Sequence, residues 1–219
     1  MIDSEQAARD WLRATPFGTD EAFARLDRLV AMLVEENAVQ NLVSAASLDA
    51  VWQRHIVDSA QLLDHVPRET FTAATAPWID LGTGAGFPGL VIATLRPRGE
   101  VVMVESRNRR IDWLNRAIAA LELPNASVVG QRLEMVETRA ASVISARAFA
   151  PLEKLLTLSA RFSTRDTLWL LPKGRSAGDE LGALKKSVAQ GFHVEQSLTD
   201  AEAGIIVGRL NRASLLKGG

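Results

Sequence analysis

The spacing of hydrophobic residues predicts helices over the first part of the chain. Apolar side chains recur there three and four residues apart, which is the spacing of one buried helical face. Leu26 and Leu33 belong to one such face, and Thr19 or Asp20 is positioned to cap the start of that helix. We therefore expect residues 1–70 to form a helical N-terminal extension.

A second helix is predicted from Ser47, its cap, to a point before Pro67. Arg54 and Asp58 are four residues apart on this helix, a spacing at which opposite charges can pair. His55 lies between them, and we interpret it as a packing or capping residue rather than a catalytic one.

From residue 77 onward, short apolar runs rich in β-branched residues alternate with helical stretches. Strands that are apolar along almost their whole length are typical of a parallel sheet with helices on both faces. The alternation favours right-handed βαβ units and a doubly wound α/β fold. The strands are predicted at residues 78–81, 101–104, 127–129, 142–145 and 167–171, with helices at 89–95, 111–121 and 152–162.

The last part of the chain has a different pattern. Two strand-like runs, 193–198 and 205–210, are separated by only a short acidic and glycine-containing connection, which suits an antiparallel hairpin and not a crossover. A doubly wound sheet that ends in such a hairpin is the Rossmann-like layout of class I methyltransferases. We expect residues 71–219 to form this domain.

Composition and charge restrict the function further. The 219 residues include no cysteine, which excludes disulfides, cysteine-ligated metals and a cysteine nucleophile. Residues 1–80 carry 13 acidic and 6 basic side chains, and the remainder carries 13 and 19, so the later part can form a basic face for a polyanion or a plain solvated surface. The acidic N-terminus does not resemble a signal peptide and no apolar run is long enough for a membrane span, so we expect a cytoplasmic protein.

A glycine-rich loop at residues 80–89 directly follows the first predicted strand and opens a helix. Gly82, Gly84 and Gly86 permit the positive φ of a tight turn and let a ligand approach the backbone closely. Glu105 ends the next strand, 23 residues after Gly82, where a carboxylate can accept hydrogen bonds from ribose hydroxyls. These features predict a site for an adenosine-containing cofactor.

Two kinds of cofactor fit this loop. Gly84, Gly86 and Gly89 match the spacing of a dinucleotide-binding turn, so an NAD-type oxidoreductase remains an alternative. Asp80 lies just before the loop, where it suits a cationic or ammonium-bearing ligand and would repel a pyrophosphate. The position of Asp80 favours S-adenosylmethionine over NAD.

Six short blocks, taken in order, resemble the ribosomal RNA small subunit methyltransferase G family, also called glucose-inhibited division protein B. Each block alone is a weak signal, but their ordered combination is highly specific. Val43 and Arg109 depart from the threonine and lysine that are common in the family, while keeping the local character. The blocks are residues 41–44, 54–59, 80–89, 105–110, 145–150 and 172–174, within a similarity that covers 41–210.

The resemblance implies methylation of guanine N7 in the decoding region of 16S rRNA, with S-adenosylmethionine as the methyl donor. It places Glu105 on the ribose and Leu133 beside the adenine, and it brings Arg147 to the site from the end of the fourth strand. The residues expected at the cofactor are Asp80, Gly82, Thr83, Gly84, Gly86, Phe87, Glu105, Leu133, Glu134 and Arg147. The residues expected at the RNA are Arg109, Arg110, Arg147 and Lys173.

The implied reaction needs little acid–base chemistry. Guanine N7 is a lone-pair acceptor without a proton, so its attack on a sulfonium methyl requires no general base. We therefore expect no catalytic acid or base and no metal, in a monomer that binds 16S rRNA or the small ribosomal subunit. A non-catalytic rRNA-binding assembly factor is the remaining alternative, although such a protein has no need of the glycine loop and Glu105.

Overall fold

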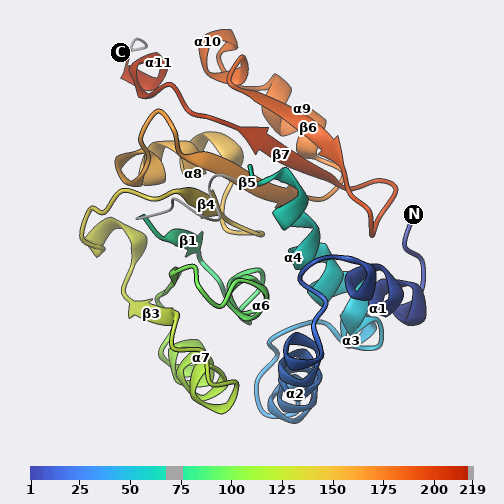
Figure 1. Ribbon diagram of the computed structural model, residues 1–219. Coiled ribbons are helices and arrows are strands. Elements are labelled where there is room, and N and C mark those ends of the chain that lie inside the picture. Colours follow the sequence, from blue (N-terminus) through green and yellow to red (C-terminus); the bar gives the residue numbers. More distant parts are fainter. Residues whose placement is uncertain (68–75, 217–219) are drawn as a thin grey trace.

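A mixed sheet of seven strands organises the computed structural model, which describes residues 1–67 and 76–216 (Figure 1). The strands are β1 (Trp78–Leu81), β2 (Val101–Glu105), β3 (Ala126–Gly130), β4 (Val143–Ser145), β5 (Leu168–Lys173), β6 (Phe192–Gln196) and β7 (Gly204–Gly208). Their order is β3-β2-β1-β4-β5-β7-β6, parallel from β3 to β5, with β7 antiparallel to both of its neighbours. The predicted parallel strands and the C-terminal hairpin are confirmed.

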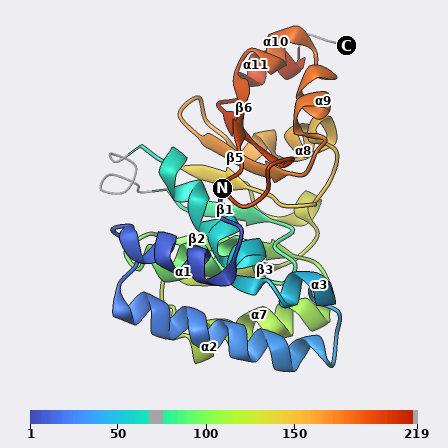
Figure 2. The same ribbon diagram turned by 90° about the vertical axis from the view of Figure 1, so that its right-hand side faces the viewer.

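Alternate side chains of the strands enter two separate hydrophobic clusters, one on each face of the sheet. In β1, for example, Trp78 packs into the first cluster and Ile79 into the second. Helices lie on both faces (Figure 2), as the doubly wound fold requires. On the first face are α6 (Gly89–Leu95) and α7 (Asn108–Ala120), and on the second are η3 (Leu133–Met135), α8 (Leu152–Ser159), η4 (Ala160–Phe162), α9 (Ala177–Gly182) and α10 (Lys186–Ala189), before the final α11 (Arg212–Leu216).

The N-terminal extension is helical, as predicted, but its second half is irregular. Thr19 caps α2 by accepting a hydrogen bond from the backbone N–H of Ala22 at 3.1 Å. The predicted cap at Ser47 is wrong: Ser44 has the extended backbone of a cap and accepts from the backbone N–H of Ser47, which lies inside α3. The elements are α1 (Glu5–Ala14), α2 (Asp20–Asn37), α3 (Ala45–Leu48), the π-helical turn η1 (Trp52–Val57), α4 (Asp58–Ala60) and the 3₁₀ turn η2 (Gln61–His65).

The extension packs against the sheet domain and reaches its C-terminal hairpin. Leu26 of α2 shares a hydrophobic cluster with Leu90 of α6 and Trp113 of α7. The side chain of Gln61 accepts a hydrogen bond from the backbone N–H of Leu198, beyond β6, at 2.7 Å. The expected boundary near residue 70 lies outside the described residues. Among the helices described, none is long and apolar enough to cross a membrane.

Candidate functional site

The loop between β1 and α6 has a backbone that favours glycine. Gly82 and Gly84 have φ values of +62° and +60°, in the left-handed region that residues with a Cβ rarely adopt. A Cβ at Gly82 would also lie 2.2 Å from Cδ2 of Phe149, so the Phe149 ring packs directly on this glycine. Backbone conformation and close packing both explain glycine at position 82.

Asp80 lies beneath the loop and organises it. Its side chain is fully buried, and Oδ1 accepts a hydrogen bond from Ser145 Oγ at 2.7 Å. Oδ2 accepts from the Gly89 backbone N–H at 3.0 Å and from the hydroxyl of Thr83, which is also buried. Burial raises the pKa of Asp80, against the opposing effect of these hydrogen bonds. The contacts tie both ends of the loop to β4.

Glu105, the last residue of β2, is only 6% exposed and contacts the loop through its carboxylate. Oε2 accepts a hydrogen bond from the Gly84 backbone N–H at 3.1 Å, and Arg110 approaches the same oxygen to 3.9 Å. Oε1 accepts from the backbone N–H groups of Ser106 and Arg107 at 2.7 and 2.9 Å. These contacts fix the carboxylate at the wall of a cavity of about 210 Å³, which we call the smaller cavity.

The smaller cavity brings together some of the predicted cofactor residues. Gly82, Glu105 and Leu133 line it, whereas Glu134 is exposed and is not part of its lining in the described chain. Arg110, expected at the RNA, lies on this cavity instead. A fixed carboxylate for a ribose diol, the backbone of Gly82 and an apolar side chain such as Leu133 for a base are groups that suit an adenosine moiety.

Arg109 faces another way from its neighbour on α7. Its Nη2 donates a hydrogen bond to the carbonyl oxygen of Val39 at 2.9 Å, and Gln40 Nε2 donates to the carbonyl oxygen of Arg109 at 3.2 Å. These bonds tie the start of α7 to the chain that follows α2. Arg109 is nevertheless exposed, so its remaining donors can meet an external anion.

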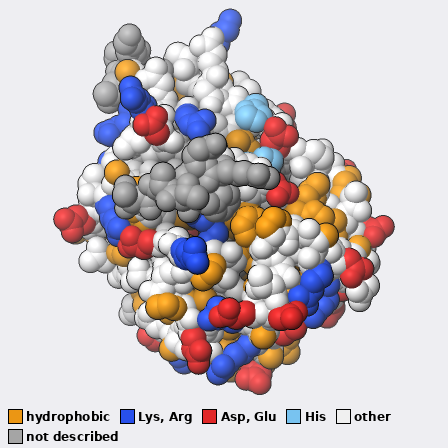
Figure 3. Space-filling model, viewed as in Figure 1, with side chains coloured by type: hydrophobic (Ala, Val, Ile, Leu, Met, Phe, Trp, Pro, Cys, Tyr) orange, Lys and Arg blue, Asp and Glu red, His pale blue; other side chains and the backbone are white. Residues whose placement is uncertain are grey.

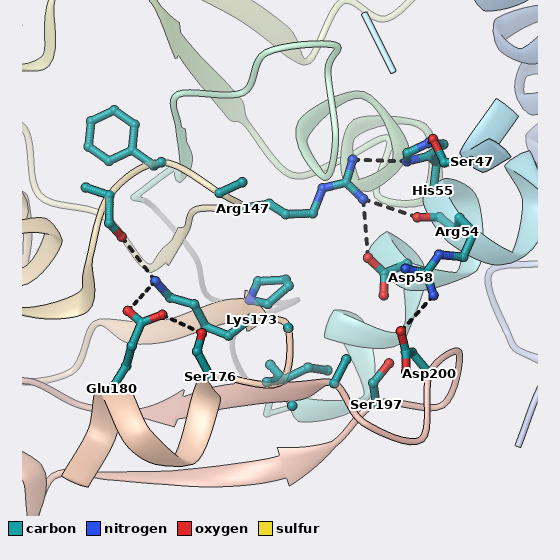
Figure 4. A pocket seen from close by; sticks show the side chains of 18 of the residues that line it. Ser47, Arg54, His55, Asp58, Arg147, Lys173, Ser176, Glu180, Ser197 and Asp200 are labelled. Carbon is teal, nitrogen blue, oxygen red and sulfur yellow. Dashed lines mark hydrogen bonds and ion pairs between the residues drawn. The ribbon is translucent and has the colours of Figure 1, made fainter. Parts of the chain in front are cut away.

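A larger pocket of about 750 Å³ lies next to the smaller cavity. Its walls come from η1, α4, the loop after β4, the end of β5, α9 and the connection between β6 and β7 (Figure 4). Ala148 and Phe149 line both spaces and form their shared wall. Arg147 and Lys173, two of the residues expected at the RNA, line the larger pocket.

Arg147 is held against the N-terminal extension. Its Nη1 donates hydrogen bonds to the carbonyl oxygen of Arg54 at 3.2 Å and to Oδ2 of Asp58 at 3.3 Å. Its Nη2 lies 3.1 Å from Nδ1 of His55. The guanidinium carbon is also 5.4 Å from the ring centroid of the buried Phe87, a cation–π distance. Phe87 thus joins the glycine loop to the extension.

The predicted ion pair between Arg54 and Asp58 is wrong. Arg54 pairs with Asp200 of the β6–β7 connection at 2.9 Å, and Asp58 pairs with Arg147 at 3.3 Å. The chain is π-helical over Trp52–Val57, so the regular α-helix assumed from the spacing is absent there. Each of the two side chains therefore faces a partner from a distant part of the sequence.

Lys173 is largely buried at the end of β5 and holds the loop that precedes α8. Its Nζ donates hydrogen bonds to Glu180 Oε2 at 2.8 Å and to the carbonyl oxygen of Ala150 at 3.1 Å. Glu180 also accepts from the backbone N–H of Leu152 and from the hydroxyl of Ser176, both at 2.8 Å. Burial opposes ionisation, but these donors hold the pKa of Glu180 below its usual value.

Several residues of the site were not identified by sequence reasoning. Phe149 lies inside a block that resembles the family, so its position was available as a signal, but its role as a shared wall was not. Ser145 and Glu180 act through contacts across 65 and 28 residues of sequence, respectively. His55 was interpreted as a packing residue, and its contact with Arg147 spans 92 residues. Local spacing does not reveal such contacts.

The remaining features of the site concern metal ligands and the lining of the larger pocket. Within residues 1–67 and 76–216, no group of three or more His, Asp or Glu side chains is arranged to hold a metal ion. The larger pocket combines apolar lining residues with three ion pairs, Arg54–Asp200, Arg147–Asp58 and Lys173–Glu180. Such a pocket can orient a polar planar ligand.

Solved structures share the fold at low sequence identity. The cofactor-bound structure of Rv0187 from MTB matches with a TM-score of 0.58 at 15% identity, covering 96% of this chain and 99% of that one. A ribosomal protein L11 methylase from Lactobacillus delbrueckii subsp. bulgaricus matches with a TM-score of 0.54 at 13% identity, covering 71% and 78%. These likenesses support the Rossmann-like methyltransferase fold.

Sequence comparison identifies the family. The family model described as rRNA small subunit methyltransferase G matches residues 22–205. A protein of that name from Erythrobacter litoralis is 56% identical over 211 residues, which are 95% of this chain and 98% of the relative. Another from Novosphingobium aromaticivorans is 57% identical over 207 residues, 94% and 89% of the two chains. The chain therefore belongs to the ribosomal RNA small subunit methyltransferase G family.

Proposed function

We propose that this protein transfers a methyl group from S-adenosylmethionine to N7 of a guanine in 16S rRNA. The observation that carries the proposal is the shared wall of Ala148 and Phe149 between the smaller cavity and the larger pocket. Two adjoining spaces, one suited to adenosine and one suited to a polar planar base, are what a direct transfer between cofactor and base requires. Family membership supplies the class of acceptor.

In the smaller cavity, Glu105 accepts hydrogen bonds from the ribose hydroxyls and Leu133 packs beside the adenine. Gly82 lets the rest of the ligand approach the backbone. Asp80 acts from below by fixing the loop, since its oxygens already accept hydrogen bonds from Ser145, Thr83 and Gly89. When bound, S-adenosylmethionine supplies a methyl group activated by its sulfonium.

In the larger pocket, the role of the protein is alignment. N7 must keep its lone pair free for the methyl group, so a donor such as Arg147 contacts O6 or a phosphate and leaves N7 unbonded. Lys173 contributes by holding the loop that carries Ala150, because its ammonium is already engaged. Correct placement of the two reactants is worth about 7–11 kcal/mol of the barrier.

The RNA backbone requires separate contacts. Basic and acidic side chains are intermixed over the face shown in Figure 3. We propose that exposed arginines, such as Arg109 on α7, bind phosphates and that the larger pocket selects the guanine. We further propose a helical extension over residues 1–70 and a methyltransferase unit over 71–219, in a cytoplasmic monomer. Light scattering of the purified protein tests the oligomeric state.

The function is tested by transfer of labelled methyl groups to small ribosomal subunits, and to naked 16S rRNA, taken from cells that lack this modification. Nuclease digestion and mass spectrometry then identify the product. The proposal predicts one N7-methylguanosine per rRNA molecule. Absence of transfer to both substrates, or a methyl group at another atom, would contradict it. Including both substrates distinguishes an enzyme that needs ribosomal proteins from an inactive one.

A further inference from the structure

His55 is buried in the wall of the larger pocket, on the π-helical turn of the N-terminal extension. The residue as a whole is only 7% exposed. The imidazole stacks on the ring of Phe87, with centroids 4.8 Å apart and an angle of 20° between the planes. This stack fixes the orientation of the imidazole ring, and therefore the direction in which its two nitrogens point.

The partners of the two nitrogens determine where the proton lies. Nδ1 is 3.1 Å from Nη2 of Arg147, and a guanidinium has only donors, so Nδ1 must be the acceptor. The proton therefore lies on Nε2, which is 3.0 Å from Oγ of Ser47 and donates to it. The arrangement requires a neutral imidazole with its proton on Nε2.

The surroundings keep the imidazole neutral. Burial, together with the positive charges of Arg147 and Arg54, lowers the pKa of His55 to about 3. Asp58 is the acidic group nearby, and its carboxylate is engaged by Arg147 and by the hydroxyl of Thr199 at 2.9 Å. His55 thus serves as an acceptor over the physiological pH range.

The same contacts determine which donors of Arg147 remain available. Its Nη1 is engaged by Arg54 and Asp58, and its Nη2 by His55. These bonds engage three of the five N–H groups of the guanidinium. In the part of the chain that the structure describes, the two other N–H groups have no protein acceptor, so they are left for a ligand of the pocket that Arg147 lines.

We propose that His55 is a positioning residue for methyl transfer: its Nδ1 lone pair orients the Arg147 guanidinium so that the two remaining N–H groups meet the guanine or its phosphate. The proposal rests on the proposed function of the pocket. A residue of the N-terminal extension thereby sets the geometry of a group at the end of β4. Loss of the acceptor leaves the Arg147 guanidinium held only through Nη1, by Asp58 and the carbonyl oxygen of Arg54.

Two near-isosteric variants distinguish the contribution of Nδ1 of His55 from that of Nε2. In His55→Asn, the amide oxygen falls near the position of Nδ1 and still accepts from Arg147. In His55→Gln, the longer amide reaches the position of Nε2 and retains the bond to Ser47, but Arg147 loses its acceptor. Both variants lose the stack on Phe87, so the difference between them reports which contact matters more for transfer, the one with Arg147 that Asn keeps or the one with Ser47 that Gln keeps.

The test measures kcat and KM for the ribosomal substrate, together with the affinity for S-adenosylhomocysteine. We expect His55→Gln to have a kcat/KM about tenfold below that of His55→Asn, the effect of one hydrogen bond to a charged group. Both variants should bind S-adenosylhomocysteine with equal affinity. The exposed His193, changed to Gln, provides a matched control whose kinetics should equal those of the wild type. Equal kcat/KM values for the Asn and Gln variants, or a more active Gln variant, would overturn the proposal.

A measurement on the unmodified protein covers the case in which the variants do not fold. Nitrogen NMR of histidine-labelled wild type should show His55 as a neutral ring with its proton on Nε2 from pH 8 to pH 5. A proton on Nδ1, or a doubly protonated ring in that range, would contradict the proposal. If the wild type binds S-adenosylhomocysteine but methylates neither rRNA nor subunits, the proposed function fails, whichever tautomer is found.

Discussion

The smaller cavity and the larger pocket are built in different ways. The smaller cavity is lined mainly by the end of β2 and the start of α7, together with Gly82 and the segments after β3 and β4, and its polar contacts are mostly bonds from backbone N–H groups to Glu105. The larger pocket is formed by side chains from η1, β4, β5, α9 and the hairpin connection, which pair with one another across long sequence separations. The proposed cofactor site is held mainly by contacts of Glu105 that are close in sequence, whereas the proposed substrate site depends on contacts between distant segments.

This contrast predicts that variants of the two regions fail in different ways. Damage to the smaller cavity should reduce the affinity for the cofactor. Damage to the larger pocket should reduce transfer to the RNA while the cofactor still binds. The variants below test this separation, from the largest expected effect to the smallest.

Glu105→Ala should have the largest effect. It removes the acceptor for the ribose hydroxyls and also frees the backbone N–H of Gly84. We expect the affinity for S-adenosylhomocysteine to fall at least about a hundredfold in calorimetric titration, as for the loss of two hydrogen bonds to a charged group. Glu137→Ala, at an exposed acid, is the control and should bind normally. An unchanged affinity of Glu105→Ala would remove Glu105 from the cofactor site.

Gly82→Ala and Gly84→Ala form a matched pair. The φ angles differ by only two degrees, at +62° and +60°, so both variants should lose about 1–2 kcal/mol of stability from backbone strain. At Gly82 the new methyl group also meets Phe149 at 2.2 Å, whereas at Gly84 it meets only the end of the Arg110 side chain at 3.3 Å. Because Phe149 lines both spaces, Gly82→Ala should lose more methyl transfer than Gly84→Ala. Equal activity of the two variants would show that the Phe149 wall is unimportant.

Lys173→Met tests the larger pocket. The change removes the donor to Glu180 and to the carbonyl of Ala150 and loosens the loop that carries Phe149. We expect kcat/KM to fall about tenfold, with cofactor affinity retained. Glu180→Gln, which keeps a polar side chain but loses the charge, should have a smaller effect, and the double variant should show that the two changes are not additive. Additive losses would indicate that the pair does not act as a unit.

The smallest effect concerns stability and pH. The pKa of His55 is lowered to about 3 in the folded protein from an ordinary value of 6.5, so between these values the unfolded chain binds more protons. The contribution of the neutral, buried His55 to the free energy of unfolding is therefore fully present above pH 6.5 and is lost as the pH falls below that value. Between pH 7 and pH 5, wild type should lose about 1–2 kcal/mol more unfolding free energy than His55→Asn, which has no titrating ring. If wild type and His55→Asn lost the same unfolding free energy between pH 7 and pH 5 in denaturation experiments, the buried, neutral state of His55 would be contradicted.

The two regions also differ in how far the sequence alone predicts them. The succession of strands and helices along the chain, the glycine loop and the position of Glu105 follow from hydrophobic spacing and local motifs, and the structure confirms that fold. The Ser47 cap and the Arg54–Asp58 pair were wrong because both assumed a regular helix where the chain forms α3 and a π-helical turn. Irregular helices of this kind leave no clear periodicity in the sequence.

Contacts between residues far apart in the sequence were the other feature that the sequence alone did not predict. The resemblance to the family named Arg147, but nothing in the sequence showed that His55, Asp58 and the carbonyl of Arg54 hold it. Asp80 similarly reads as a group facing a ligand, while the fold buries it beneath the loop. The partners of Arg147, and Ser145 as a partner of Asp80, come from distant segments, so their arrangement is a property of the assembled fold.

The most direct test of the separation between the two regions is the affinity of Arg147→Ala for S-adenosylhomocysteine, measured by calorimetry beside its rate of methyl transfer. Arg147 lines the larger pocket and stands apart from the contacts of Glu105. The account predicts wild-type affinity for S-adenosylhomocysteine, no binding of NAD and a methyl transfer rate reduced at least tenfold. An affinity reduced as far as that of Glu105→Ala would contradict the account, because Arg147 would then belong to the cofactor site.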